Sequence, residues 1–196
     1  MQYYIYSLVC FLLPGTVWLI WNKGMIADKA YKTRHIIWIY IYMFYGYLAV
    51  QEAAGIGTIW DLITYGKLDN SINLIPFSSE GAMTYILNII MFMPLGFLLP
   101  LIWKNFRNAK KVVLMGFLMS LAIEICQLFN IRTTDIDDLM MNTLGTLVGY
   151  CCWKVFSLIF RNAGTKCVEM KKSEPVIYMF GGILGLFLLY NWRVFN

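Results

Sequence analysis

Charged residues are scarce in this chain of 196 residues. Asp, Glu, Lys and Arg together make up 14% of the sequence, whereas hydrophobic residues make up 60%. Soluble globular domains carry about 25% charged and about 45–50% apolar residues. The composition therefore indicates an integral membrane protein. The length fits one domain, which we assign to residues 1–196.

Histidine and cysteine are also few, with one His and five Cys. The cysteines form no C-x-x-C pair and lie mostly in apolar segments, which argues against a disulfide framework and against a zinc site. We expect them to serve as packing residues. His35 lies among basic residues and is expected to contact lipid headgroups. The sequence offers no Ser–His or Cys–His pair of the kind found in nucleophilic catalysts.

Six apolar segments alternate with polar connections, and most are close to the roughly 20 residues that a membrane-spanning helix needs. They cover residues 3–21, 36–56, 83–103, 112–129, 139–160 and 176–192. The predicted fold class is therefore all-α, a polytopic transmembrane helix bundle of about six spans. The last segment is the shortest, at the lower limit for spanning.

Basic residues lie mainly in the connections after the first, third and fifth segments. Cytoplasmic loops of membrane proteins are enriched in Lys and Arg, so these connections are predicted to be cytoplasmic and both chain termini extracytoplasmic. Of the 16 basic residues, only Lys67, Arg132 and Arg193 would then lie outside. Short basic clusters beside apolar spans fit membrane lipids as partners and argue against nucleic-acid binding.

The stretch 120–142 is unusually polar for its apolar surroundings. Successive residues of a helix turn by about 100°, which predicts two polar faces on consecutive helices. These faces carry Ser120, Glu124 and Gln127 on the first helix, and Asp135, Asp138 and Asn142 on the second. Asp137 is expected to point away and to act as a helix cap. Ionisable groups at membrane depth are costly, so these faces are predicted to form a functional site.

Further polar residues near the outer ends of other segments extend this site. Glu52 ends the second segment and Asn88 begins the third, while Arg132 in the connecting turn is the natural partner of Glu124. The predicted site therefore lies at the extracytoplasmic end of the bundle. Its substrate-binding candidates are Glu52, Asn88, Gln127, Arg132, Asp135 and Asn142.

Several chemistries remain open for this site. Glu124 and Asp138 could act as a catalytic acid–base pair. No cofactor is predicted, although the same oxygens could hold a divalent cation. Arg132 could bind a phosphate or carboxylate of a lipid-linked substrate. The structural alternatives are a Glu124–Arg132 pair that joins two helices, capping by Asp135, and interhelical hydrogen bonds from the amide side chains.

Four phrases occur in order between residues 73 and 150: NLIPF at 73–77, NIIMFMPLG at 88–96, SLAIEICQ at 120–127 and RTTDIDDLMMNTLGTLVGY at 132–150. With these spacings, this part of the chain resembles the VanZ-like family of bacterial membrane proteins. The resemblance implies a protein of the bacterial cytoplasmic membrane. In the best-known members it also implies lowered susceptibility to the lipoglycopeptide teicoplanin. It supplies no reaction, and the segment 176–192 lies outside it.

Two functions follow from these observations. In the first, the protein binds or remodels a lipoglycopeptide or a lipid-linked envelope molecule at the outer leaflet and so reduces antibiotic action. In the alternative, it is a membrane-embedded hydrolase or transferase that acts on a lipid-linked envelope substrate through Glu124 and Asp138. A transporter is less favoured, because the inner halves of the segments contain almost no polar path.

Overall fold

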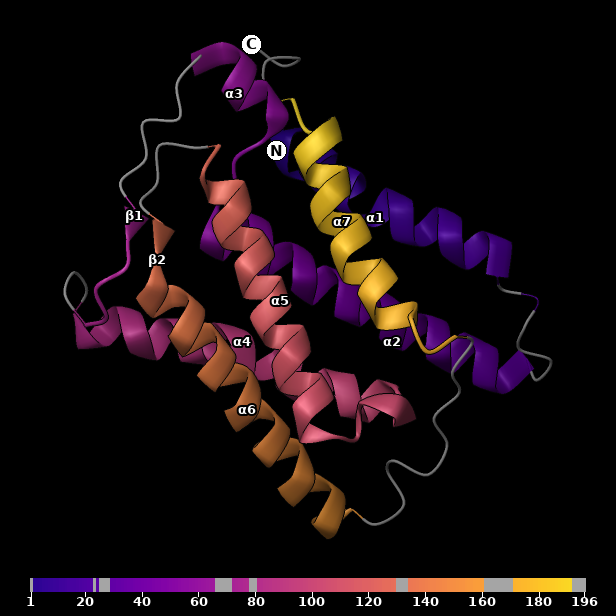
Figure 1. Cartoon of the computed structure of the whole chain (residues 1–196). Coiled ribbons are helices and arrows are strands. Elements are labelled where there is room, and N and C mark those ends of the chain that lie inside the picture. The colour runs from indigo at the N-terminus through magenta and orange to yellow at the C-terminus, as the bar shows by residue number, and fades with distance from the viewer. Residues whose placement is uncertain are drawn as a thin grey trace.

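The structure, a computed structural model, describes residues 2–22, 24, 29–65, 72–77, 81–129, 134–160 and 171–191. Helices form most of this part of the chain (Figure 1), which confirms the all-α prediction. Its six long helices overlap the six predicted apolar segments, although the second begins at Lys29 rather than at residue 36 and ends at Tyr47 rather than at residue 56. They are α1 (Gln2–Asn22), α2 (Lys29–Tyr47), α4 (Ala82–Ile102), α5 (Ala109–Gln127), α6 (Ile136–Ile159) and α7 (Glu174–Leu189).

Short elements occupy several of the connections. The π-helix η2 (Leu48–Ala54) continues α2, and it ends at Gly55 in the left-handed conformation. The helix α3 (Ile59–Tyr65) follows, and the 3₁₀-helix η3 (Lys104–Phe106) joins α4 to α5. The strands β1 (Ile72–Asn73) and β2 (Thr134–Asp135) pair in parallel. This pairing ties the segment before α4 to the first turn of α6.

The long helices expose apolar side chains and bury polar ones. On α4, for example, Ile86, Leu87 and Ile90 are exposed, whereas Asp137 of α6 and Glu174 of α7 are fully buried. Among the described residues, α1 and α4 are the two helices long and apolar enough to cross a membrane, and α7 is a shorter apolar helix. These features are consistent with a membrane protein.

The most extensive helix–helix contact is between α4 and α6. A Cβ atom on Gly149 would overlap the carbonyl of Met93, and one on Gly96 would overlap the carbonyl of Thr146. Only residues without a side chain allow two helix backbones to approach this closely. A Cβ atom on Gly145, one turn before Gly149 on α6, would likewise overlap the backbone of Ile89 on α4. The contact brings the first turns of α4 and α6 together.

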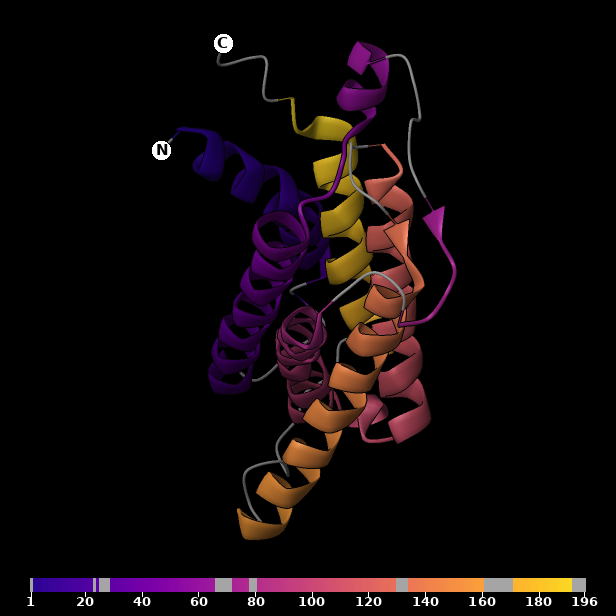
Figure 2. The same ribbon diagram turned by 90° about the vertical axis from the view of Figure 1, so that its left-hand side faces the viewer.

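The two ends of the bundle carry different elements. In Figure 1, α3, the first turn of α1 and the last turn of α7 lie in the upper part of the view, and β1 and β2 lie at the left, above the start of α4. The end of α6 lies at the bottom of the view, the start of α5 lies in its lower part, and the first turn of α7 lies below its last turn; Figure 2 shows the same separation from the side. The basic residues Lys104, Lys110, Lys111, Lys154, Lys171 and Lys172 belong to this second end.

His35 contradicts its predicted contact with lipid headgroups, because its side chain is buried. Its Nε2 lies 2.9 Å from Oε1 of the buried Glu174. The indole of Trp103 donates to Glu174 Oε2 at 3.0 Å, and the hydroxyl of Tyr178 donates to Oε1 at 3.1 Å. A carboxylate removed from solvent needs such donors, because an unpaired buried charge is strongly destabilising. This contact therefore joins α2, the end of α4 and α7.

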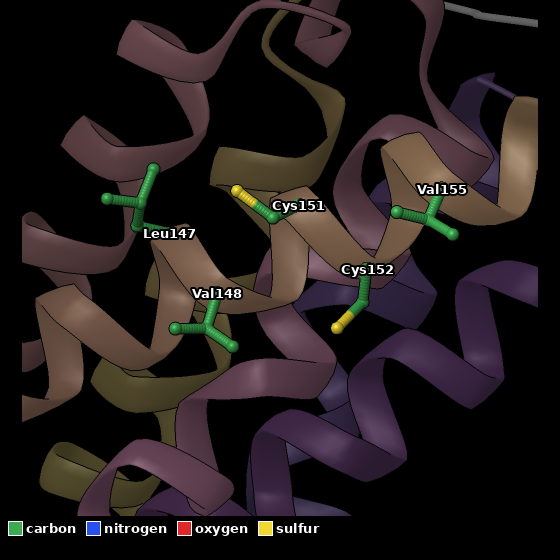
Figure 3. Close-up of a pocket in the computed structure, with 5 residues that line it drawn as sticks. All are labelled: Leu147, Val148, Cys151, Cys152 and Val155. Carbon is green, nitrogen blue, oxygen red and sulfur yellow. The ribbon is translucent and has the colours of Figure 1, made fainter.

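The predicted packing role of the cysteines is right for two of the four described thiols. Cys10 and Cys126 are buried, whereas Cys151 and Cys152 are exposed on α6. All four are free thiols. The two exposed side chains line an apolar groove on the outer face of α6 together with Leu147, Val148 and Val155 (Figure 3). None of the predicted site residues lines this groove.

Candidate functional site

Asp135 immediately precedes α6 and acts as its N-cap. Its backbone is extended, and its Oδ1 accepts a hydrogen bond from the backbone N–H of Asp137 at 2.9 Å. Its Oδ2 accepts from the side-chain amide of Asn73 at 3.0 Å. The capping role left open by the sequence is therefore present. The same carboxylate also fastens β1 beside the start of α6.

Asp137, which was expected to face away from Asp138 and Asn142 and to serve only as a helix cap, has partners of its own in the structure. Its side chain is fully buried. Each of its carboxylate oxygens lies 2.9 Å from the backbone nitrogen of Phe77, and Oδ2 also accepts from the hydroxyl of Tyr85 at 2.9 Å. The helical geometry was counted correctly, but the face opposite α5 is covered by the 72–77 segment and by α4. Asp137 is thus the point to which both are fastened.

Asp138 and Asn88, both predicted for the site, meet across the α4–α6 contact. The amide of Asn88 donates to Oδ1 of Asp138, whose side chain is half-buried. The sequence places the two residues on separate predicted helices 50 positions apart. Their meeting follows from the close packing of α4 on α6.

Asn142 faces α5, as its position on α6 predicted. Its amide nitrogen donates to the hydroxyl of Ser120 at 3.0 Å. Its Oδ1 is buried and has no hydrogen-bond partner among the described residues. Gln127, two turns further along the same face of α5, donates to the carbonyl of Ala54 at 3.1 Å, and its Oε1 is likewise without a partner in the described part of the chain. Two buried amide oxygens in this region therefore have no hydrogen-bond donor among the described residues.

Glu124 lies on α5 between Ser120 and Gln127 and is buried, with 5% of its surface exposed. The helices α5 and α6 run in opposite directions (Figure 1). Ser120 meets Asn142, and Glu124 and Asp138 each lie one turn beyond this contact on their own helix. They are therefore at the same level, about 6 Å along the helix axes from the Ser120–Asn142 contact. We refer to Asn88, Ser120, Glu124, Gln127, Asp138 and Asn142 as the polar cluster.

Two predicted site residues fall outside this description. Arg132 lies outside the described residues, so its pairing with Glu124 stays a prediction. Glu52 belongs to η2, but its side chain is not among those described. The segment that carries it does reach the polar cluster, because Gln127 bonds to Ala54 and the N–H of Gly57 donates to the carbonyl of Cys126 at 3.2 Å.

The sequence reasoning did not identify the partners of the two buried aspartates. Asn73 and Phe77 belong to the NLIPF phrase and Tyr85 to the first turn of α4, and all three act by holding Asp135 or Asp137. The one feature of the sequence that could have indicated these partners is the polar Asn73 directly before an apolar run. Among the described residues, no group of three or more His, Cys, Asp and Glu side chains is arranged to hold a metal ion.

Comparison with known proteins supports the resemblance found in the sequence. Residues 35–158 match the family model described as VanZ/LLP1. The chain is 36% identical over 134 residues to Protein VanZ of Enterococcus faecium, and the alignment covers 67% of this chain and 77% of that protein. No solved structure matches significantly. The matched range contains the whole polar cluster and ends before α7.

The contacts of the first turn of α6 predict unequal roles in stability for two adjacent aspartates. Asp137→Ala should lower the free energy of unfolding by about 2 kcal/mol, because the buried carboxylate accepts from two donors and a hydrogen bond contributes about 0.5–1.5 kcal/mol. Asp138→Ala, at a half-buried position, should cost about 1 kcal/mol. Denaturant unfolding of the purified protein in detergent measures both. Equal losses would contradict the assignment of Asp137 as the anchor.

Proposed function

Because the chain belongs to the VanZ/LLP1 family, we propose that it is a multi-pass protein of the bacterial cytoplasmic membrane with an outward-facing polar site. At this site it binds an amphipathic molecule of the cell envelope. Through this binding it lowers susceptibility to lipoglycopeptide antibiotics of the teicoplanin type.

The distribution of apolar side chains supports a multi-pass arrangement. Large hydrophobic residues are exposed on all six long helices, not only on α1 and α4. Exposed apolar surface is unfavourable in water by roughly 25 cal/mol per Å², and large exposed patches mark protein or membrane contacts. A lipid environment removes this cost. Six membrane spans, with the polar side chains turned toward one another, account for the whole pattern.

The distribution of basic residues supports the orientation. The end of the bundle with η3 and the first turn of α7 carries most of the described Lys side chains, which the positive-inside rule assigns to the cytoplasm. The last turn of α5 and the first turns of α4 and α6 belong to the opposite end. The polar cluster would then open toward the outside.

Two amide oxygens of the polar cluster have no partner in the described part of the chain, and they carry the binding proposal. A buried acceptor without a donor costs about 1–3 kcal/mol, so Asn142 Oδ1 and Gln127 Oε1 favour a ligand that supplies N–H or O–H groups. The carboxylate of Glu124 between them favours donors further. The ligand's polar part is therefore rich in hydroxyl, amide or ammonium groups. Glycopeptides and lipid-linked envelope sugars share this chemistry.

One observation favours catalysis as a second candidate. The helix register brings Glu124 and Asp138 to one level of facing helices, and Asp138 is already held by Asn88. A buried carboxyl group beside a second, hydrogen-bonded one is the arrangement used for acid–base hydrolysis or transfer. The substrate would again be a lipid-linked envelope molecule. Recovery of this molecule unchanged after incubation with the protein would exclude this candidate.

The binding proposal predicts the behaviour of a charge-deleting variant. Glu124→Gln keeps the size and hydrogen-bonding capacity of the side chain but removes its charge. Cells that express it should return to the teicoplanin susceptibility of cells without the protein, while the melting temperature of the purified variant stays unchanged. The measurement is the minimum inhibitory concentration of teicoplanin, compared with that of a glycopeptide that has no acyl chain.

Asp61→Asn is the control for Glu124→Gln, because Asp61 is an acidic residue outside the polar cluster whose carboxylate accepts from Thr58 at the start of the short helix α3. It should retain protection. Full protection by Glu124→Gln would contradict the proposal. Lost protection accompanied by a large fall in melting temperature would instead identify Glu124 as a structural residue.

The orientation predicts which introduced thiols an impermeant reagent reaches in intact cells. In a cysteine-free background, Ile63→Cys on α3 should be labelled, because this exposed position lies at the predicted outer end. Gly24→Cys should be labelled only after permeabilisation. A Cβ at Gly24 meets no atom within 4 Å, so this substitution should not disturb folding. The opposite labelling pattern would reverse the topology and remove the outward-facing site.

A further inference from the structure

The segment 74–77, which we call the 74–77 loop, is apolar and strongly exposed. The exposed fractions are 70% for Leu74, 68% for Ile75 and 62% for Phe77, and Pro76 is exposed as well. The loop lies between β1 and α4 and contains no charged residue. Four consecutive exposed apolar residues are unfavourable in water. Their exposure therefore calls for a partner that covers them.

Two of the three backbone N–H groups of this loop donate hydrogen bonds within the protein. The N–H of Ile75 donates to the side-chain oxygen of Asn73 at 3.1 Å, and the N–H of Phe77 donates to the carboxylate of Asp137 at 2.9 Å. Pro76 has no N–H to satisfy. A loop that faces water does not need this, because water accepts its hydrogen bonds. In hydrocarbon each unpaired backbone group costs several kcal/mol, so internal pairing is required there.

The loop is also held in a fixed conformation. Phe77 has a φ angle of 60°, a left-handed conformation that is unfavourable for a residue with a side chain. Such a conformation persists only where the surroundings enforce it. Here the carboxylate of Asp137 holds the backbone, and the ring of Phe77 packs edge to face on Tyr85 with centroids 5.9 Å apart. The exposed side chains are therefore presented by a rigid support.

The neighbouring surface of α4 has the same character. Tyr85, against which Phe77 packs, is flanked by the exposed side chains of Met83, Ile86 and Leu87. The loop and the first two turns of α4 therefore present apolar side chains next to each other. Asn88 of the polar cluster lies on the same stretch of α4 and is half-buried. The apolar surface thus borders the polar cluster.

We propose that the 74–77 loop inserts into the outer leaflet of the membrane, where its side chains pack among phospholipid acyl chains. This inference rests on the outward orientation proposed above. The inserted loop would lie beside the polar cluster at the start of α4. A ligand of that cluster would then arrive from the leaflet with its acyl chain already in the bilayer, which fits a lipid-bearing molecule.

A spin label at Ile75→Cys measures the depth of this loop directly. The full-length, cysteine-free protein would be placed in nanodiscs of phosphatidylglycerol and phosphatidylcholine. Collision rates with dissolved oxygen, which concentrates in lipid, and with a water-soluble nickel chelate report the surroundings of the label. We expect high oxygen and low nickel accessibility, as for a reference label at Leu87→Cys on α4. A label at Lys172→Cys, on an exposed polar connection, supplies the aqueous reference.

Two results would overturn the proposal. Nickel accessibility equal to that of Lys172→Cys would place the loop in water. A label reached by neither reagent would mean that protein, such as a second copy of the chain, covers the loop. Leu74→Cys repeats the measurement at a second exposed position. The depth measurement does not depend on antibiotic protection. A loop found in water would therefore leave the proposal for the polar cluster standing, and full protection by Glu124→Gln would leave the measured depth of the loop unchanged.

Discussion

A carboxylate enclosed by apolar helices must find hydrogen-bond donors, and this requirement governs both ends of the bundle. At one end, Asp137 takes its donors from the backbone of Phe77 and from Tyr85, which fastens the 72–77 segment and α4 to α6. At the other end, Glu174 takes its donors from Trp103 and Tyr178 and meets His35. These contacts join elements that lie far apart in the sequence, and they add to the close glycine packing of α4 on α6.

The polar cluster differs from these anchors in one respect. The carboxylate oxygens of Asp137 are satisfied within the protein, whereas the amide oxygens of Asn142 and Gln127 have no partner among the described residues. Buried polar groups are nearly always paired, so exceptions call for an explanation. A ligand with donor groups supplies one, and the rigid apolar 74–77 loop beside the cluster suits the lipid part of such a ligand.

The sequence predicted what depends on local pattern. Apolar run length located the six long helices, and helix periodicity anticipated that Asn142 faces α5. Contacts made over long separations were not predictable in this way. Glu174 meets His35 across 139 positions, and Asp137 meets Phe77 across 60. Two-residue strands such as β1 and β2 have no periodicity to detect. Family resemblance singled out the NLIPF phrase, but not that its backbone binds an aspartate.

The most direct measurement of the central claim is an experimental structure of the protein in a lipid bilayer with a teicoplanin-type ligand. The account predicts ligand density between α5 and α6 at the outer end, with donor atoms within hydrogen-bond distance of Asn142 Oδ1 and Gln127 Oε1, and acyl chains against the 74–77 loop. A closed interface, in which protein groups pair both amide oxygens and the ligand binds elsewhere, would contradict it.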